Sequence, residues 1–118
     1  SLMYSAAVFR DGVHVINVML QRSKMKLYYM IYIDGRFNGE WTKKDHEIGQ
    51  KYLLEHVVTP SKKYVRDLAY LQGLKGKARE AFIEKTCRPM MIGYKPYGSA
   101  AAIAKKFASI ENLEIIQE

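Results

Sequence analysis

The spacing of apolar and polar positions changes near Thr42, from patterns typical of strands to patterns typical of helices. Residues 27–33 read LYYMIYI, an unbroken apolar run of aromatic and β-branched side chains that ends at Asp34-Gly35. A run of seven residues has the length of a strand rather than of a helix. We therefore expect a strand here, and we place it at the centre of a sheet.

The residues before this run predict further strands. Apolar stretches at 6–9 and 13–20 flank Arg10-Asp11-Gly12, a turn signal, so the first forty residues or so should form an antiparallel meander. Residues 13–25 would also fit a helix, although β-branched side chains at the start of the segment favour a strand. After the central run, Asp34-Gly35 and Asn38-Gly39 are hairpin signals. They predict a returning strand through residues 37–41.

Helical spacing begins after Thr42. One face of a helix over residues 43–57 would carry Ile48, Tyr52, Leu53 and Val57. Thr59-Pro60-Ser61 then provides capping residues and a proline, which together indicate the start of a second helix. On that helix the apolar face is predicted to hold Tyr64, Val65, Leu68 and Leu71, and on a third helix, after Gly73 and Gly76, it is predicted to hold Ala78, Ala81 and Phe82.

The last third of the chain predicts a strand over 89–94, a helix over 100–109 and a strand over 113–116. Strands followed by helices and then by a strand-helix-strand unit are typical of the α+β class. A length of 118 residues suits one domain. We expect a single α+β domain over residues 1–118, with helices packed on an antiparallel sheet. Ser1 and Leu2, before Met3, have the pattern of a cloning remnant.

Charge adds a functional expectation to this fold. The net charge is +7 and the isoelectric point is near 9.5, which favours polyanionic partners without selecting among them. Lys and Arg side chains neutralise phosphates, and an aromatic ring among them can stack on a base. The predicted nucleic-acid-binding residues are Lys62, Lys63, Arg66, Tyr70, Lys75, Lys77 and Arg79. The alternative is an ordinary solvated helix face.

A second candidate site lies where the last helix begins. Free backbone amides at a helix N-terminus attract anions, and Lys95 beside Gly98 and Ser99 could complete a phosphate cradle with the hydroxyls of Tyr94 and Tyr97. The alternative is that Ser99 only caps the helix and that its alanines only allow close packing. The spacing differs from that of a P-loop.

Aromatic content suggests a further role for the sheet. There are nine tyrosines, and strand alternation places Tyr28, Met30 and Tyr32 on one face. If that face is open, it resembles the platforms that bind single-stranded nucleic acids. Otherwise helices cover it, or it pairs with another subunit, since Tyr and Met are frequent at interfaces. A homo-oligomer or a protein-interaction module is therefore the alternative function.

Enzymatic chemistry has little support in the sequence. His14, His46 and His56 do not cluster at a metal-ligand spacing, so we predict neither a metal nor a cofactor. A metal-dependent nuclease would need Asp34, Glu40 and Asp45 to converge. The single cysteine, Cys87, fits a reducing cytoplasm, and no apolar run reaches the roughly 18 residues of a membrane span.

Two segments carry a resemblance. IYIDGRFNGEW at 31–41 and GYKPYGSAAAIAKKF at 93–107 resemble small prophage-encoded proteins of unknown function. This resemblance implies no activity, but it suggests a mobile-element origin, and small basic proteins of such elements often serve DNA or RNA transactions. The sequence thus favours a non-enzymatic nucleic-acid-associated module.

Overall fold

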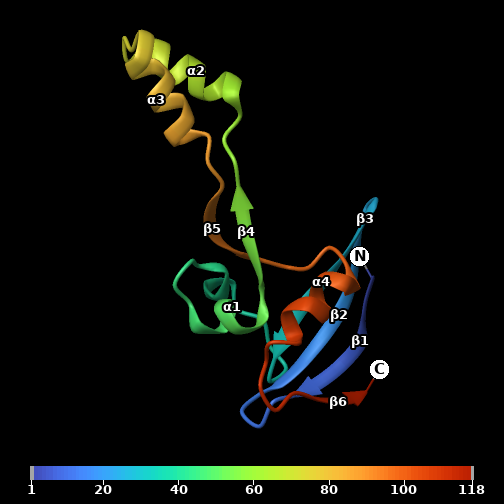
Figure 1. Cartoon of the computed structure of the whole chain (residues 1–118). Helices are drawn as coiled ribbons and strands as arrows, with labels where there is room; N and C mark the ends of the chain where they lie inside the picture. Colours follow the sequence, from blue (N-terminus) through green and yellow to red (C-terminus); the bar gives the residue numbers. More distant parts are fainter. Residues whose placement is uncertain (1, 118) are drawn as a thin grey trace. The chain divides into compact units, whose positions relative to one another are not determined.

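The computed structural model describes residues 2–117 and has an α+β fold, as the sequence predicts (Figure 1). The interpretation of Ser1 as part of a cloning remnant lies outside the described residues. In chain order the elements are β1 (Leu2–Arg10), β2 (Val15–Ser23), β3 (Lys26–Ile33), the 3-10 helix η1 (Gly39–Thr42), α1 (Glu47–Tyr52), β4 (Leu54–Val58), α2 (Lys62–Leu71), α3 (Gly76–Thr86), β5 (Met90–Lys95), α4 (Ala100–Phe107) and β6 (Glu114–Gln117).

These elements belong to two compact units. One, the sheet unit, comprises the chain up to His56 together with the segment from Gly93 onward, and the other, the hairpin unit, comprises Val57–Ile92. The boundaries fall within β4 and within β5, which pair with each other as a two-stranded sheet. The prediction of one domain over the whole chain stays a prediction.

The sheet unit is built on four antiparallel strands in the order β3-β2-β1-β6. The N-terminal meander is therefore confirmed, and residues 15–23 are strand rather than helix. The central position predicted for residues 27–33 is wrong, because β3 lies at an edge. No strand returns through Phe37 and Trp41 to cover it. Asn38 instead caps η1, with its side-chain oxygen accepting a hydrogen bond from the Glu40 amide at 2.9 Å.

One face of this sheet holds the core. Ile16, Val18, Ile31 and Ile33 are nearly or fully buried. Helix α4 covers this face, and the ring of Phe107 meets that of Phe9 edge-on at 5.3 Å between centroids (Figure 1). The predicted packing of a helix on the sheet is thus confirmed for α4, whereas α2 and α3 belong to the hairpin unit.

The helix predicted over residues 43–57 is wrong in its second half. Helix α1 ends at Tyr52, Leu53 is extended with φ −101° and ψ 164°, and Leu54–Val58 forms β4. The segment LEHVV alternates half-buried and exposed positions and ends in two β-branched residues, which suits a strand. The same apolar residues fit both periods over so short a stretch.

The C-terminal elements match the prediction closely along the chain but not in their pairing. Ser99 caps α4, and β6 follows near the predicted position. However, β5 pairs with β4 while β6 pairs with β1, so the two strands lie in different sheets. The predicted strand-helix-strand succession is thus present along the chain, with its two strands in different sheets.

In the hairpin unit, α2 begins at the predicted cap, with the Ser61 hydroxyl accepting from the Tyr64 amide at 3.2 Å. Of the predicted apolar face Val65 is fully buried, as is Ala69 next to it, while Leu68 is half-buried. Tyr64 and Leu71 are 59% and 78% exposed. On α3, Ala78 and Ala81 are exposed and Phe82 is half-buried, so the predicted inner faces are only partly correct.

Gly49 in α1 gives a test of the packing. An added Cβ there would overlap the carbonyl oxygen of Trp41 and would lie 2.5 Å from Cδ2 of Tyr94. We expect Gly49→Ala to lower the free energy of unfolding by about 1–3 kcal/mol, the usual range for overpacking. The measurement is urea unfolding followed by the fluorescence of Trp41. Gly39→Ala is the control, because its Cβ would meet nothing within 4 Å; equal stability of the two variants would contradict the packing described here.

Candidate functional site

All seven residues predicted to bind nucleic acid lie in the hairpin unit and are exposed. Lys62, Lys63, Arg66 and Tyr70 stand on α2, and the Tyr70 side chain is 82% exposed. Lys63 and Tyr70 are seven residues apart, close to two helical turns, and so share one side of α2. The remaining three residues lie at or after the turn into α3. The predicted set therefore lies on one helical hairpin.

Part of this set faces carboxylates. Lys62 and Arg66 line a groove of about 460 Å³ together with Glu80 and Glu84 of α3. Each pair is spaced four residues apart, so each forms one row along its helix. The groove is therefore lined by charges of both signs, and the Glu84 carboxylate also lies 4.0 Å from the guanidinium of Arg88. Outside the groove, the exposed cations of this unit are Lys63, Lys75, Lys77, Arg79, Lys85 and Arg88, and Asp67 lies four residues from Lys63 on the same side of α2.

The turn into α3 has a defined backbone. Gly73 and Gly76 adopt positive φ angles of 72° and 58°, and Lys75 occupies the N-cap position of α3 without a side-chain capping bond. Lys75 and Lys77 are both exposed. Cations therefore surround the start of α3, where the helix dipole already contributes positive potential.

The residues predicted to bind an anion lie in the sheet unit and have structural roles in part. The Ser99 hydroxyl accepts a hydrogen bond from the Ala102 amide at 3.2 Å, which caps α4. Lys95 is half-buried and Gly98 is exposed. The phenol of Tyr97 is not free for a cradle, because it donates to the carbonyl oxygen of Tyr52 at 2.5 Å. Anion binding by Lys95, Gly98 and Ser99 stays a prediction.

The face of the sheet opposite α4 is less buried than the core face. Tyr28, Met30 and Tyr32 are all half-buried, as is Met19 on β2. The ring of Tyr32 contacts that of Phe37 at 6.3 Å between centroids. This face thus keeps some solvent access, in contrast to the core face, where Ile31 and Ile33 are 0% and 3% exposed.

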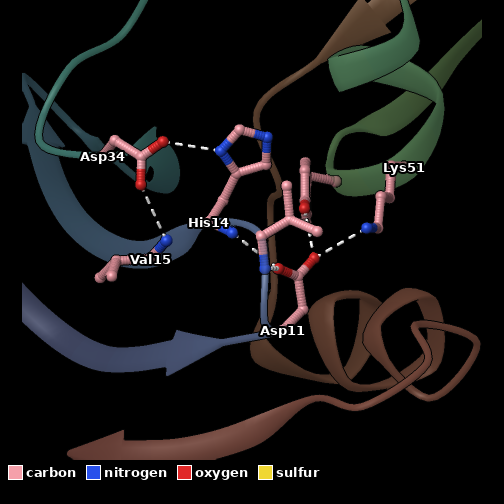
Figure 2. A network of polar contacts seen from close by, with 7 residues as sticks. Asp11, His14, Val15, Asp34 and Lys51 are labelled. Atoms are coloured by element: carbon pink, nitrogen blue, oxygen red, sulfur yellow. Dashed lines mark hydrogen bonds and ion pairs between the residues drawn. The ribbon is translucent and has the colours of Figure 1, made fainter.

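A polar network that the sequence did not reveal lies in the sheet unit (Figure 2). Asp11, buried in the β1–β2 turn, accepts from the amides of Val13 and His14 at 3.0 and 2.8 Å through Oδ1. Through Oδ2 it accepts from the Tyr52 hydroxyl and pairs with Lys51 Nζ at 2.8 Å. Nearby, His14 Nδ1 lies 2.6 Å from Asp34, whose other oxygen accepts from the Val15 amide at 2.9 Å.

The environment shifts the titration of this network. Burial would raise the pKa of Asp11, but the hydrogen bonds from Lys51, Tyr52 and two backbone amides outweigh it and hold that pKa well below its usual range. Burial, followed by the bond to Asp11, raises the pKa of the Tyr52 phenol to about 12. Every oxygen of the Asp11 carboxylate is thus satisfied by protein groups. The network fits a structural clamp rather than a catalytic centre.

The carboxylates considered for a metal site do not converge. Among the described residues, no three side chains of His, Cys, Asp or Glu come together as a metal-binding group. Asp34 binds within the turn network, and Glu40 pairs with Lys43 at 2.6 Å. The gathering of Asp34, Glu40 and Asp45 that a metal-dependent nuclease requires is therefore not formed in residues 2–117. Within the same range, no helix is both long and apolar enough to span a bilayer.

Local signals could have identified some of these features. Asp11 before Gly12 is typical of a side chain that accepts from amides two and three residues later. The pairing of Asp11 with Lys51 and Tyr52 spans about forty residues and has no local signal. Glu80 and Glu84 could have been placed on one side of α3 from their spacing alone.

The clamp predicts a defined pH dependence. Because the folded pKa of Asp11 is depressed, its contribution to stability is present above the unfolded pKa of about 3.9 and is lost as pH falls through lower values. We expect Asp11→Asn to lower the free energy of unfolding at pH 7 by roughly 3 kcal/mol, because Lys51 loses its partner and the amide cannot accept all four bonds. Urea unfolding at pH 7 and pH 3 measures this free energy. The difference in free energy of unfolding between wild type and Asp11→Asn should be smaller at pH 3 than at pH 7.

Asp45→Asn serves as the control for this measurement, since Asp45 is exposed. Its effect should stay within about 0.5 kcal/mol at both pH values. A gap for Asp11→Asn that is equal at pH 7 and pH 3 would show that the carboxylate charge does not stabilise the fold.

In comparisons with known proteins, no protein-family model, no curated protein and no solved structure matches this chain.

Proposed function

We propose that the protein is a non-enzymatic nucleic-acid-binding module and that the hairpin unit is its contact surface. The observation that carries this proposal is the distribution of charge. Residues 57–92 hold eight Lys and Arg against three Asp and Glu, a net +5, out of +7 for the whole chain. A unit of this kind concentrates a positive field on a small surface, which attracts phosphates.

A second observation supports a role for these cations beyond keeping the protein soluble. Lys62 and Lys63 stand in the first turn of α2, and Lys77 and Arg79 stand at the start of α3. Neither first turn contains an acidic residue. Because the helix dipole is positive at its N-terminus, cations there destabilise a helix by some tenths of a kcal/mol each. Residues that oppose local stability are expected at functional positions.

Tyr70 supports nucleic acid over other polyanions. Its ring is 82% exposed on the side of α2 that carries Lys63, with Asp67 between the two. An exposed aromatic ring beside cations can stack on an unpaired base while the cations hold the phosphates. We therefore propose single-stranded DNA or RNA as the ligand, bound outside the groove in which Glu80 and Glu84 oppose Lys62 and Arg66. The lone thiol Cys87 supports placing this activity in a reducing cytoplasm.

The role of charge in binding can be tested by reversing the charge of two lysines in the hairpin unit. Lys75→Glu with Lys77→Glu should weaken binding to a fluorescein-labelled single-stranded oligonucleotide at least tenfold at 50 mM salt, because several phosphate contacts are lost. The same variant should unfold at an equal or higher temperature than wild type, since the new carboxylates favour the N-terminus of α3. Fluorescence anisotropy and thermal unfolding measure the two effects.

The matched control is Lys24→Glu with Lys26→Glu, at the exposed β2–β3 turn of the sheet unit. It changes net charge by the same amount, and we expect its affinity to fall by less than about threefold, through the long-range field alone. Equal losses of affinity in the two double variants would show that net charge, rather than the hairpin surface, governs binding. No binding of wild type at 50 mM salt would refute the proposal.

The stacking prediction concerns Tyr70. Tyr70→Leu should weaken binding about fivefold or more while leaving the salt dependence unchanged, because it removes a ring and no charge. Tyr64→Leu is the control, since Tyr64 is also exposed but lies on another side of α2. Identical affinities of the two variants in the same titration would exclude stacking by Tyr70, and the partner would then be a polyanion recognised by charge only.

A further inference from the structure

Half of strand β1 has an open edge. On one side β1 pairs with β2 along its whole length, from Leu2 opposite Arg22 to Arg10 opposite Val15. On the other side β6 pairs only with Val8, Phe9 and Arg10. No described residue pairs with Leu2–Ala7 on that side. A sheet edge of this kind presents backbone donors and acceptors that can pair with another strand.

The outward-pointing groups can be assigned from the register. The carbonyl of Val15 accepts from the Asp34 amide, so the backbone groups of Val15 point toward β3. Alternation gives Met19 and Gln21 on β2 the same direction. Their partners on β1 are Ser5 and Met3, whose backbone groups consequently point away from β2. Met3 and Ser5 therefore carry the free amides and carbonyls of this edge.

This edge lacks the usual protection against pairing. Edge strands are commonly blunted by lysines, prolines or other charged side chains. Residues 2–7 read LMYSAA and contain neither a charge nor a proline, in a chain with 26% charged residues. The only charged residue of β1 is Arg10, which is already paired with Glu114 at 2.8 Å. Strand β1 has a β-bulge between Ser5 and Ala7 in its pairing with β2 and a register shift between Val8 and Phe9 in its pairing with β6.

An apolar groove continues from the same edge. It has a volume of about 630 Å³ and is lined from β1 by Ala6 and Phe9, from α4 by Ala104 and Phe107, and from β6 by Ile115. Ile115 is 59% exposed, and Tyr4, on the adjacent part of β1, is 54% exposed. An added strand would place its side chains in this groove while its backbone bonds to β1. The occupant must therefore be extended, uncharged and apolar.

We propose that this occupant is β1 of a second copy of the chain, paired antiparallel across a twofold axis near Tyr4. The segment LMYSAA meets the requirements just stated, and in an isologous contact each copy supplies the strand that the other lacks. Copies that each carry +7 repel one another, and residues 2–7 carry no charge that would add to this repulsion.

The consequences are specific. Met3 of one copy faces Ser5 of its partner, the two Tyr4 side chains lie opposite each other, and two four-stranded sheets join into one. The dimer also carries two hairpin units on one particle, which raises the avidity for a long oligonucleotide if the hairpin binds one. The dimer itself does not depend on nucleic-acid binding.

The first experiment measures mass by light scattering after size exclusion, at chain concentrations from about 1 to 200 μM. Wild type should approach twice 13.6 kDa as concentration rises. Ser5→Pro should stay at 13.6 kDa, because it removes an amide hydrogen that points outward and is not needed within the monomer. Ser5→Ala should dimerise like wild type, since it removes only the exposed hydroxyl bond to Asn17.

The second experiment covers the case in which Ser5→Pro does not fold. In a Cys87→Ser background, Tyr4→Cys should form an intermolecular disulfide under mild oxidation at least tenfold faster than Val13→Cys. Both positions are exposed, and Val13 lies at the opposite end of β1 in the β1–β2 turn. A strict monomer at every concentration, or a folded Ser5→Pro variant that dimerises, would overturn the proposal. Equal disulfide rates at the two positions would overturn it as well.

Discussion

The sheet unit depends on one buried carboxylate. Asp11 accepts two backbone amides of its own turn and, through its other oxygen, binds the side chains of Lys51 and Tyr52. Tyr52 in turn accepts, at its carbonyl oxygen, the hydroxyl of Tyr97. Three segments that are distant in sequence are joined in this way. A buried charge without these partners would destabilise the fold by several kcal/mol, so the segments must fold together.

The β3 edge of the sheet is covered by other segments of the chain. Tyr97 exchanges two backbone hydrogen bonds with Tyr29, at 2.8 and 3.0 Å, and so covers the middle of the β3 edge. Arg36 pairs in the same manner with Ile33 farther along β3. The chain therefore protects this edge with its own loops. At the opposite edge β6 pairs with Val8, Phe9 and Arg10, and no strand within residues 2–117 pairs with the first half of β1 on that side.

Much of the secondary structure could be predicted because its causes are local. The turn at Asp11-Gly12, the caps at Ser61 and Ser99 and the alternation along β2 and β3 are readable from neighbouring residues. The order of the strands in the sheet could not be predicted, because it depends on pairing between segments far apart in the sequence, such as β1 with β6. The apolar run of β3 has the composition of a central strand because its core-facing side chains, such as Ile31 and Ile33, are buried. Nevertheless β3 lies at an edge of the sheet.

The candidate site shows the same division between local and tertiary causes. That Lys63, Tyr70, Lys75 and Lys77 are exposed follows from helical spacing alone, and their exposure is observed. That Lys62 and Arg66 line one groove with Glu80 and Glu84 follows from how α2 and α3 align, which no local pattern specifies. The sequence therefore predicted the exposure of these residues but not the acidic residues that share a groove with Lys62 and Arg66.

The hairpin unit carries cations at its helix N-termini that do not stabilise its fold. Within α2 only Val65 and Ala69 are buried, and no residue of α3 is. So small a core supplies little free energy to offset destabilising residues on the surface. Both helices nevertheless begin with cations, which the positive end of the helix dipole repels. Acidic residues at those positions would strengthen the fold at no cost in packing, since the side chains are exposed. Folding alone thus does not account for the lysines at the helix starts.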